Sequence, residues 1–225
     1  MTKDRGVLLL EGLDWLGLQP EDCVVDDLLI YLDELIRWSR KMNLIGRHMR
    51  VEEIIEKHFI DSLTLLGLSI PRHSTFLDVG SGAGFPGLVC KVVRRDLSLT
   101  IVEPRLKRVS FLRHIVRTLD LHQVTVLDTR VEEMKMPSRT PLFTHITGRA
   151  VTELADFLTL ISSCLHPEVQ VICMKGPKWR EEFNRATEVL KRTTLQLTSM
   201  TELKLPFSGA ERVLLVFEHG DCRGG

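Results

Sequence analysis

The chain has 225 residues, 44% of them hydrophobic and 27% charged, and its 30 Lys and Arg residues balance its 30 Asp and Glu residues. This composition is typical of a globular protein with one large domain, or one domain and an appendage. The zero formal net charge excludes nucleic-acid binding through bulk charge, so any such binding depends on local basic groups.

Membrane insertion and secretion are not expected from the sequence. No apolar run approaches the ~20 residues of a membrane span, and Val7–Leu10 is too short for the apolar core of a signal peptide. The five cysteines form no C-x-x-C pair and leave an odd one over, which is typical of reduced thiols. We therefore expect a cytoplasmic monomer. We expect no metal site, because no H-x-x-x-H or C-x-x-C spacing occurs.

The first 70 residues contain no alternating strand pattern. Apolar residues at helical spacing predict helices over Asp4–Leu16, from Pro20 to about Met42–Asn43, and over Val51–Leu66. We interpret residues 1–70 as an N-terminal helical cap, which ends where Gly, Pro and Ser cluster before Thr75.

From Thr75 onward, predicted strands and helices alternate, which indicates a parallel α/β sheet over residues 71–220. The predicted parallel strands are Thr75–Val79, Leu99–Val102, Val124–Leu127, Thr144–Thr147 and Val169–Met174. The predicted helices are Phe85–Val93, Leu106–Leu119, Val151–Cys164 and Glu181–Lys191. Two last extended stretches, Leu195–Leu203 and Arg212–Glu218, have only a loop between them and predict an antiparallel hairpin. Five parallel strands and such a hairpin are the plan of the Rossmann-like class I methyltransferases. Residues 221–225 are expected to be a frayed tail.

A glycine-rich turn follows the first strand, with the sequence Gly80-Ser-Gly82-Ala-Gly84-Phe-Pro-Gly87. It matches the dinucleotide pattern G-x-G-x-x-G, but Asp78 inside the preceding strand would face a pyrophosphate unfavourably. The same carboxylate suits an ammonium group, directly or through water. Glu103, which closes the next strand, can accept hydrogen bonds from ribose hydroxyls. An ammonium, a ribose and no phosphate together fit S-adenosylmethionine.

Several short motifs then resemble one family in order along the chain. The sequence resembles the RsmG (GidB) family, which methylates N7 of a guanine in a decoding-region loop of 16S ribosomal RNA. The matching motifs are Trp38-Ser-Arg-Lys-Met-Asn43-Leu44, Lys57-His58-Phe-Ile-Asp61-Ser62, Asp78 to Gly87, Lys107-Arg108-Val-Ser-Phe111-Leu112, Arg130-Val131-Glu132, Gly148-Arg149-Ala150, Lys175-Gly176 and Glu211-Arg212.

This resemblance implies cofactor contacts by position. The contacts that it implies are Gly80, Phe85, Val131, Glu132 and Arg149, and the residue pattern adds Asp78, Gly82 and Glu103. Arg149, after the fourth strand, can form a bidentate pair with a carboxylate. One departure is Glu103-Pro104, where the family usually has Asp-Ser, and proline removes a backbone donor.

Guanine N7 carries an in-plane lone pair and no proton, so the implied reaction needs no general base and depends on alignment. We therefore name no catalytic acid or base. The candidates for substrate or RNA contact are His58, Lys107, Arg108, Lys175 and Arg212. For His58 a structural hydrogen bond is an equal alternative, and the cations of Arg105–Arg117 are equally well explained as a solvated helix face.

Two other functions remain open at this point. The first is a catalytically inactive RNA-binding or ribosome assembly factor on the same fold. The second is a nucleotide-cofactor dehydrogenase, which Asp78 disfavours. The sequence does not distinguish naked 16S rRNA from the small ribosomal subunit as the partner.

Overall fold

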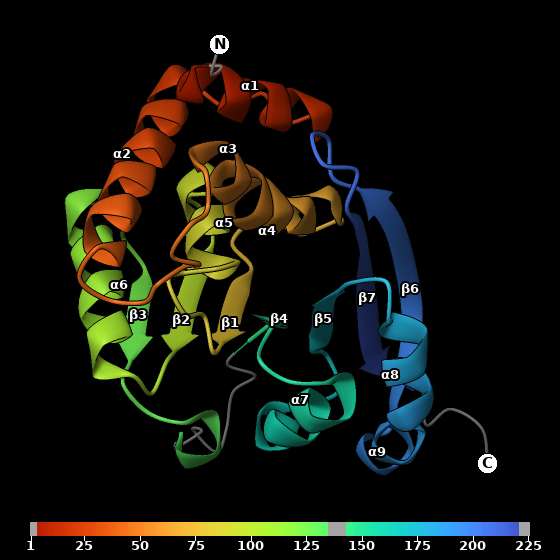
Figure 1. Cartoon of the computed structure of the whole chain (residues 1–225). Coiled ribbons are helices and arrows are strands. Elements are labelled where there is room, and N and C mark those ends of the chain that lie inside the picture. The colour runs from red at the N-terminus through yellow and green to blue at the C-terminus, as the bar shows by residue number, and fades with distance from the viewer. Residues whose placement is uncertain (1–3, 135–142, 221–225) are drawn as a thin grey trace.

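The computed structural model of the chain describes residues 4–134 and 143–220, so the expected tail lies outside the described residues. Within these ranges, seven strands form one sheet in the order β3-β2-β1-β4-β5-β7-β6 (Figure 1). The strands are β1 Thr75–Val79, β2 Ser98–Val102, β3 Val124–Leu127, β4 His145–Arg149, β5 Gln170–Lys175, β6 Leu195–Lys204 and β7 Glu211–His219.

The first five strands pair in parallel, and β7 is antiparallel to both β5 and β6. The predicted class of five parallel strands with an antiparallel hairpin is therefore confirmed. β1 lies between β2 and β4, which is where the strand order reverses. Ligands of open α/β sheets bind at such a switch point, outside the carboxyl ends of the strands.

Helices cover both faces of the sheet. On one side lie α1 Arg5–Trp15, α2 Asp22–Ser39, α3 Val51–Ile54, the π-helical turn η1 Ile55–Ile60, α4 Asp61–Leu63, the 3₁₀ turn η2 Thr64–Gly67, α5 Gly87–Val93 and α6 Leu106–Thr118. Below them in Figure 1 lie α7 Leu154–Leu160, η4 Ser162–Cys164, α8 Trp179–Arg185 and α9 Thr187–Thr193, and η3 Val131–Glu133 follows β3.

Side chains that alternate between the two faces of the sheet divide the hydrophobic core into two clusters. Phe76 of β1 packs with the helices of residues 1–118, whereas Leu77 and Val79 pack with α7 to α9. Successive side chains of a strand point to opposite faces, so one short apolar strand contributes to both clusters. Helices α1 and α2 arch over α3 to α5 in Figure 1, and their buried residues belong to the same cluster as one face of the sheet.

Element ends differ from the sequence-based expectations at three functionally relevant places. The predicted helix over Val51–Leu66 is instead α3, η1, α4 and η2 in succession, and π-helical turns occur often at functional sites. β4 continues through Arg149. The following helix begins only at Leu154, because Ala150 adopts a positive φ of 54° and turns the chain at the sheet edge.

Candidate active site

The glycine turn after β1 is packed tightly from both sides. Gly80 has φ +68° and donates its N–H to the carbonyl of Val102 at 2.8 Å. A Cβ on Gly80 would lie 3.0 Å from Val151, and one on Gly84 would lie 2.0 Å from the hydroxyl of Tyr31 on α2. Positive φ and close neighbours therefore both require glycine here. The close approach also fixes α2 against the turn, where Tyr31 donates to the carbonyl of Ala83 at 2.6 Å.

Asp78 lies fully buried beneath this turn. Its Oδ2 accepts hydrogen bonds from the hydroxyl of Ser81 at 2.6 Å and from the N–H of Gly87 at 2.8 Å. Burial raises the pKa of Asp78 to about 6, against the lowering effect of these two bonds. The carboxylate thus braces the turn from below, and its predicted contact with an ammonium group stays a prediction.

One cavity of 410 Å³ opens beside the ends of β1, β2 and β4. Its walls include Val131, Val151 and Leu160, and the predicted site residues Gly80, Glu103 and Glu132 line it as well. Glu103 is 2% exposed. Its carboxylate accepts from the N–H of Gly82 and from that of Arg105, each at 3.0 Å. The donor that Pro104 lacks is therefore supplied one residue later.

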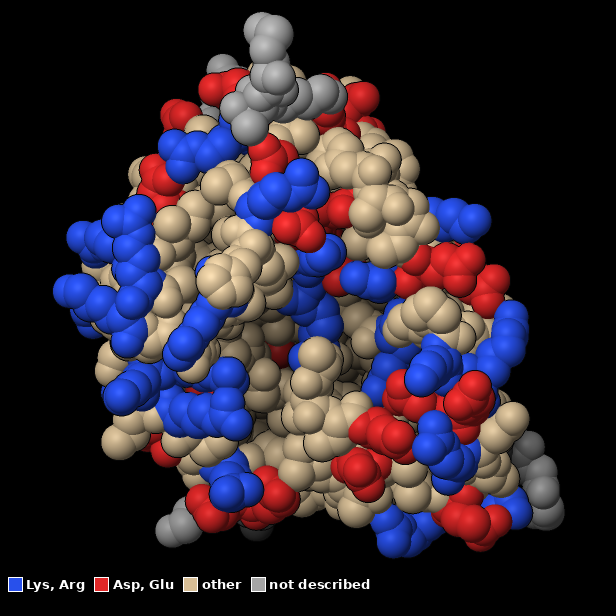
Figure 2. Space-filling view, viewed as in Figure 1, with Lys and Arg blue, Asp and Glu red and all other residues tan. Residues whose placement is uncertain are grey.

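A second cavity of 540 Å³ adjoins the first and shares Gly80, Arg108, Ala150 and Thr152 with it. The predicted site residues in its lining are His58, Gly80, Gly82, Phe85, Arg108, Arg149, Lys175 and Arg212. Figure 2 shows a hollow near the middle of this face, with Lys and Arg side chains on its walls. The structure thus brings most of the predicted site residues together around two joined cavities.

Arg149 and Arg212 share one carboxylate, that of Asp61. Arg149 Nη1 lies 3.1 Å from Asp61 Oδ2, and Arg212 Nε lies 3.1 Å from both carboxylate oxygens. Arg149 also donates to the carbonyl of Lys57 at 2.6 Å. The side chains of Asp61 and Arg149 are only 5% and 13% exposed, so this is a buried ion pair. Burial lowers the pKa of Arg149, and Asp61 opposes that effect.

His58 contacts both Arg149 and the ring of Phe85, and the Arg149 guanidinium also lies over that ring, 5.1 Å from its centroid. Its ring stacks on Phe85 with centroids 4.9 Å apart, and its Nδ1 is 3.1 Å from Arg149 Nη2. Since a guanidinium only donates, Nδ1 accepts and Nε2 carries the proton. Nε2 is buried without a hydrogen-bond partner in the part of the chain that the structure describes. Burial, with Arg149 and Lys57 nearby, lowers the pKa of His58 to about 3, so the ring is neutral at physiological pH.

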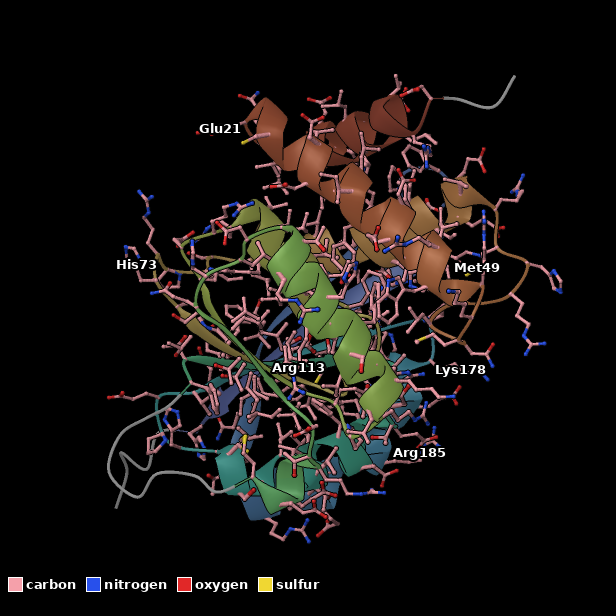
Figure 3. The ribbon with its side chains drawn as sticks, turned by 90° about the vertical axis from the view of Figure 1, so that its left-hand side faces the viewer. Glu21, Met49, His73, Arg113, Lys178 and Arg185 are labelled. Atoms are coloured by element: carbon pink, nitrogen blue, oxygen red, sulfur yellow. The ribbon has the colours of Figure 1, made fainter. Side chains whose placement is uncertain are left out.

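The remaining basic candidates differ in whether their charges are already paired with a carboxylate of the protein. Lys175 donates a hydrogen bond to the carbonyl of Thr152 at 2.9 Å and forms an ion pair with Glu182 at 2.7 Å, so its charge is already balanced within the protein. Arg108 lies 3.5 Å from Glu103 at the border of the two cavities. Lys107 is exposed, lies outside both cavities and makes no ion pair with a described residue. In Figure 3, Met49 and Lys178 lie on the side of the molecule opposite His73.

Comparison with known proteins identifies the family. Residues 25–213 match the family model described as GidB: rRNA small subunit methyltransferase G. The chain belongs to this family.

Relatives within the methyltransferase G family are similar over nearly their whole length. The chain is 44% identical to the ribosomal RNA small subunit methyltransferase G of Desulfotalea psychrophila, across 92% of this chain and 95% of that protein. It is 34% identical to the protein of the same name from Syntrophotalea carbinolica, across 93% and 96%. The methyltransferase interpretation is therefore confirmed over the dehydrogenase alternative.

Solved structures support the fold. The M. jannaschii TYW2 protein in complex with AdoMet superposes with a TM-score of 0.58 at 12% identity, covering 77% of this chain and 80% of that one. A SAM-dependent methyltransferase from Aquifex aeolicus gives 0.55 at 19% identity, covering 80% and 97%. The chain thus has the class I methyltransferase fold. Together with its membership of a methyltransferase family, this fold makes S-adenosylmethionine its cofactor. No helix in the described ranges is long and apolar enough to cross a membrane.

Sequence reasoning gave no site role to three residues that line these cavities. Asp61 holds both arginines, and Ala150 and Thr152 line both cavities. Asp61 stood in the sequence three residues after His58, but its partners are 88 and 151 residues away. Ala150 was visible only as part of the Gly148-Arg149-Ala150 motif.

Proposed function

We propose that this enzyme transfers the methyl group of S-adenosylmethionine to N7 of a guanine in the decoding-region loop of 16S ribosomal RNA. Membership of the rRNA small subunit methyltransferase G family supports an rRNA substrate. The choice of N7 and of the loop follows from the resemblance of the motifs around His58, Phe85 and Arg149. Such a substrate implies that the enzyme acts in the cytoplasm, and we propose that it does so as a monomer.

The observation that carries the proposal is the pair of joined cavities at the carboxyl edge of the sheet. The residues of the first cavity fit the adenosine half of the cofactor. Val131 and Val151 give apolar walls for adenine, Glu132 can accept from its amino group, and Glu103 retains lone pairs for ribose hydroxyls. The space beside Gly80, which a Cβ would fill against Val151, lets the cofactor pass from the first cavity into the second.

The second cavity is assigned to the methionine half and the target base. Gly82 and Phe85 border it from the glycine turn, and Asp78 acts on it through that turn. Arg149 Nη2 and Nη1 already contact His58 and Asp61, so Arg149 positions these side chains around the base and cofactor. Arg108 and Lys107, at the start of α6, are placed for phosphate groups of the RNA.

The chemistry of the cavity agrees with N7 as the acceptor. When bound, the cofactor supplies an electrophilic methyl group. N7 presents a lone pair without a proton, so the protein must align the base and exclude water rather than remove a proton. His58 is a poor base because its pKa is about 3, and the carboxylate of Asp61 is held by two guanidinium groups. The described residues around the base thus suit alignment.

Two measurements test the proposal. Unmethylated 16S rRNA and small ribosomal subunits are each incubated with enzyme and S-adenosylmethionine, and aniline cleavage then locates N7-methylguanine. Cleavage at one guanine of the decoding-region loop is expected. A methyl group on an exocyclic amine or in another loop would overturn the regiochemistry, and binding of the cofactor without any transfer would favour the inactive assembly factor.

The adenosine assignment has its own matched pair of variants. Glu132→Gln should weaken S-adenosylmethionine binding about tenfold in calorimetry, which corresponds to ~1.4 kcal/mol. Glu133→Gln should leave it unchanged, because Glu133 bonds Thr129 and lies outside both cavities. Equal affinities for the two variants would remove Glu132 from the cofactor site.

A further inference from the structure

A third cavity lies next to the proposed base site, between the loop after β5 and the β6–β7 hairpin. Its volume is 350 Å³. It shares Gly176 and Arg212 with the 540 Å³ cavity, so the two lie side by side. Ligand pockets span roughly 300–1,000 Å³, which makes this space large enough for one small planar group.

The third cavity has an apolar floor and a charged rim. The buried Trp179 and Val213 and the half-buried Leu203 line the floor, and the exposed Pro177 borders it. The rim carries Arg180, Glu202, Lys204 and Glu211.

The rim side chains are already ordered by contacts with one another. Arg180 lies over the ring of Trp179 at 4.3 Å and donates to Glu202 at 2.8 Å. Both members of this pair are more than half exposed, at 63% and 52%, so they can exchange their contact for a ligand.

We propose that this cavity holds the base of a nucleotide adjacent to the methylated guanine, and that it prefers a base with an exocyclic amino group. This inference rests on the proposed function, because it needs a target base in the neighbouring cavity. Single-stranded RNA is recognised by splaying successive bases into separate pockets. The two neighbouring cavities, which share Gly176 and Arg212, are placed for two successive bases.

The rim chemistry selects the kind of base. Carboxylates only accept hydrogen bonds, so Glu202 and Glu211 match the amino groups of cytosine, adenine or guanine, and uracil offers none. Arg180 and Lys204 match the phosphates on either side of that nucleotide. A site for phosphate alone would not contain two carboxylates, which repel it.

The test combines variants of the cavity with changes of the RNA. Arg180→Ala/Glu202→Gln removes the rim pair, and Arg185→Ala/Glu188→Gln is the control, because Arg185 and Glu188 pair elsewhere with Glu153 and Lys191. All four side chains are exposed, so folding should be preserved. The rim variant should raise KM for 16S rRNA at least fivefold, with kcat and cofactor affinity within twofold of wild type. The control should match wild type.

The second part of the test uses RNA transcripts in which one or the other neighbour of the target guanine is replaced by uracil. One of them should raise the wild-type KM by a similar factor and have a smaller effect on the rim variant, since both changes remove the contact with Glu202 while Glu211 is retained. Equal KM values for rim and control variants, or a full uracil effect in the rim variant, would overturn the cavity assignment alone. A KM change seen with small subunits but not with naked transcript would assign the cavity to a ribosomal protein and overturn it too. Absence of any rRNA methylation by the wild type would instead overturn the proposed function, and this inference with it.

Discussion

Replacing Asp61 by Asn tests whether its carboxylate holds Arg149 and Arg212 in place. Asn keeps the size of the side chain and one acceptor oxygen, but it removes the charge that faces Arg149 and Arg212. Arg149 is then left as a buried cation without its paired carboxylate, in contact with the carbonyl of Lys57, with His58 and with the ring of Phe85. Removing one member of a buried ion pair is far more damaging than removing a surface pair.

The expected magnitude follows from burial. Breaking a buried pair costs ~3–5 kcal/mol, and the retained acceptor of Asn places the variant near the lower end, at ~3 kcal/mol. For a chain of this size each kcal/mol lowers Tm by about 2–4 °C, so a loss of roughly 6–12 °C is expected. Asp33→Asn is the matched control, because Asp33 pairs with Arg5 at the surface and is 58% exposed. Its cost should stay below ~1 kcal/mol.

Thermal and urea unfolding of the two variants, with methyl transfer to rRNA measured in parallel, supplies the readout. Asp61→Asn should lose most of its transfer activity at a temperature where it is still folded, because Arg149 and Arg212 are no longer held in place. A loss of less than 1 kcal/mol together with wild-type turnover would refute the idea that Asp61 anchors the two arginines.

Three further results are expected. His58 should show no titration of its ring signals by NMR between pH 5 and 8, because its pKa is lowered to about 3, and an apparent pKa above 6 would contradict its buried, neutral state. Asp78→Asn should gain stability relative to wild type as pH rises from about 4 through 6. The pKa of Asp78 in the folded protein, about 6, lies above its ordinary value of 3.8, so wild type loses stability over that window, by ~3 kcal/mol at most. If the difference in urea midpoint between Asp78→Asn and wild type stayed the same from about pH 4 to pH 6, the raised pKa of Asp78 would be contradicted. Gly84→Ala should destabilise by at least ~1–3 kcal/mol through its clash with Tyr31, and adding Tyr31→Phe should restore part of that loss, whereas purely additive costs would show that the clash is relieved elsewhere.

The cofactor side of the site was accessible to sequence reasoning for a physical reason. Short apolar runs locate parallel strands, and the residues directly after them meet at one edge of the sheet. Glu103 follows β2, Val131 and Glu132 follow β3, and the structure brings all three into one cavity. The glycine turn was equally visible, because positive φ and close packing leave few residue types other than glycine.

The substrate side was less accessible, because it depends on contacts between distant segments. His58 and Asp61 were visible as a pair on one predicted helix, but the sequence contained no sign that Arg149 and Arg212 would converge on Asp61. The π-helical turn also escaped prediction, since its apolar spacing fits an ordinary helix equally well. Lys175 was expected at the ligand edge and lies there, yet its partner Glu182 could be found only in three dimensions.

The helical stretch from Val51 to Gly67 connects the β6–β7 hairpin to the rest of the proposed site. Its Glu56 accepts from the N–H groups of Phe207 and Ser208 at 2.7 Å each, which ties the β6–β7 loop to the helical layer. One turn later, Asp61 ties the same hairpin to the end of β4 through Arg212 and Arg149. Methyltransferases of 12–19% identity share the sheet. Because function depends on the site attached to a fold rather than on the fold itself, we expect the contacts made by this stretch to contribute to selection of the target guanine.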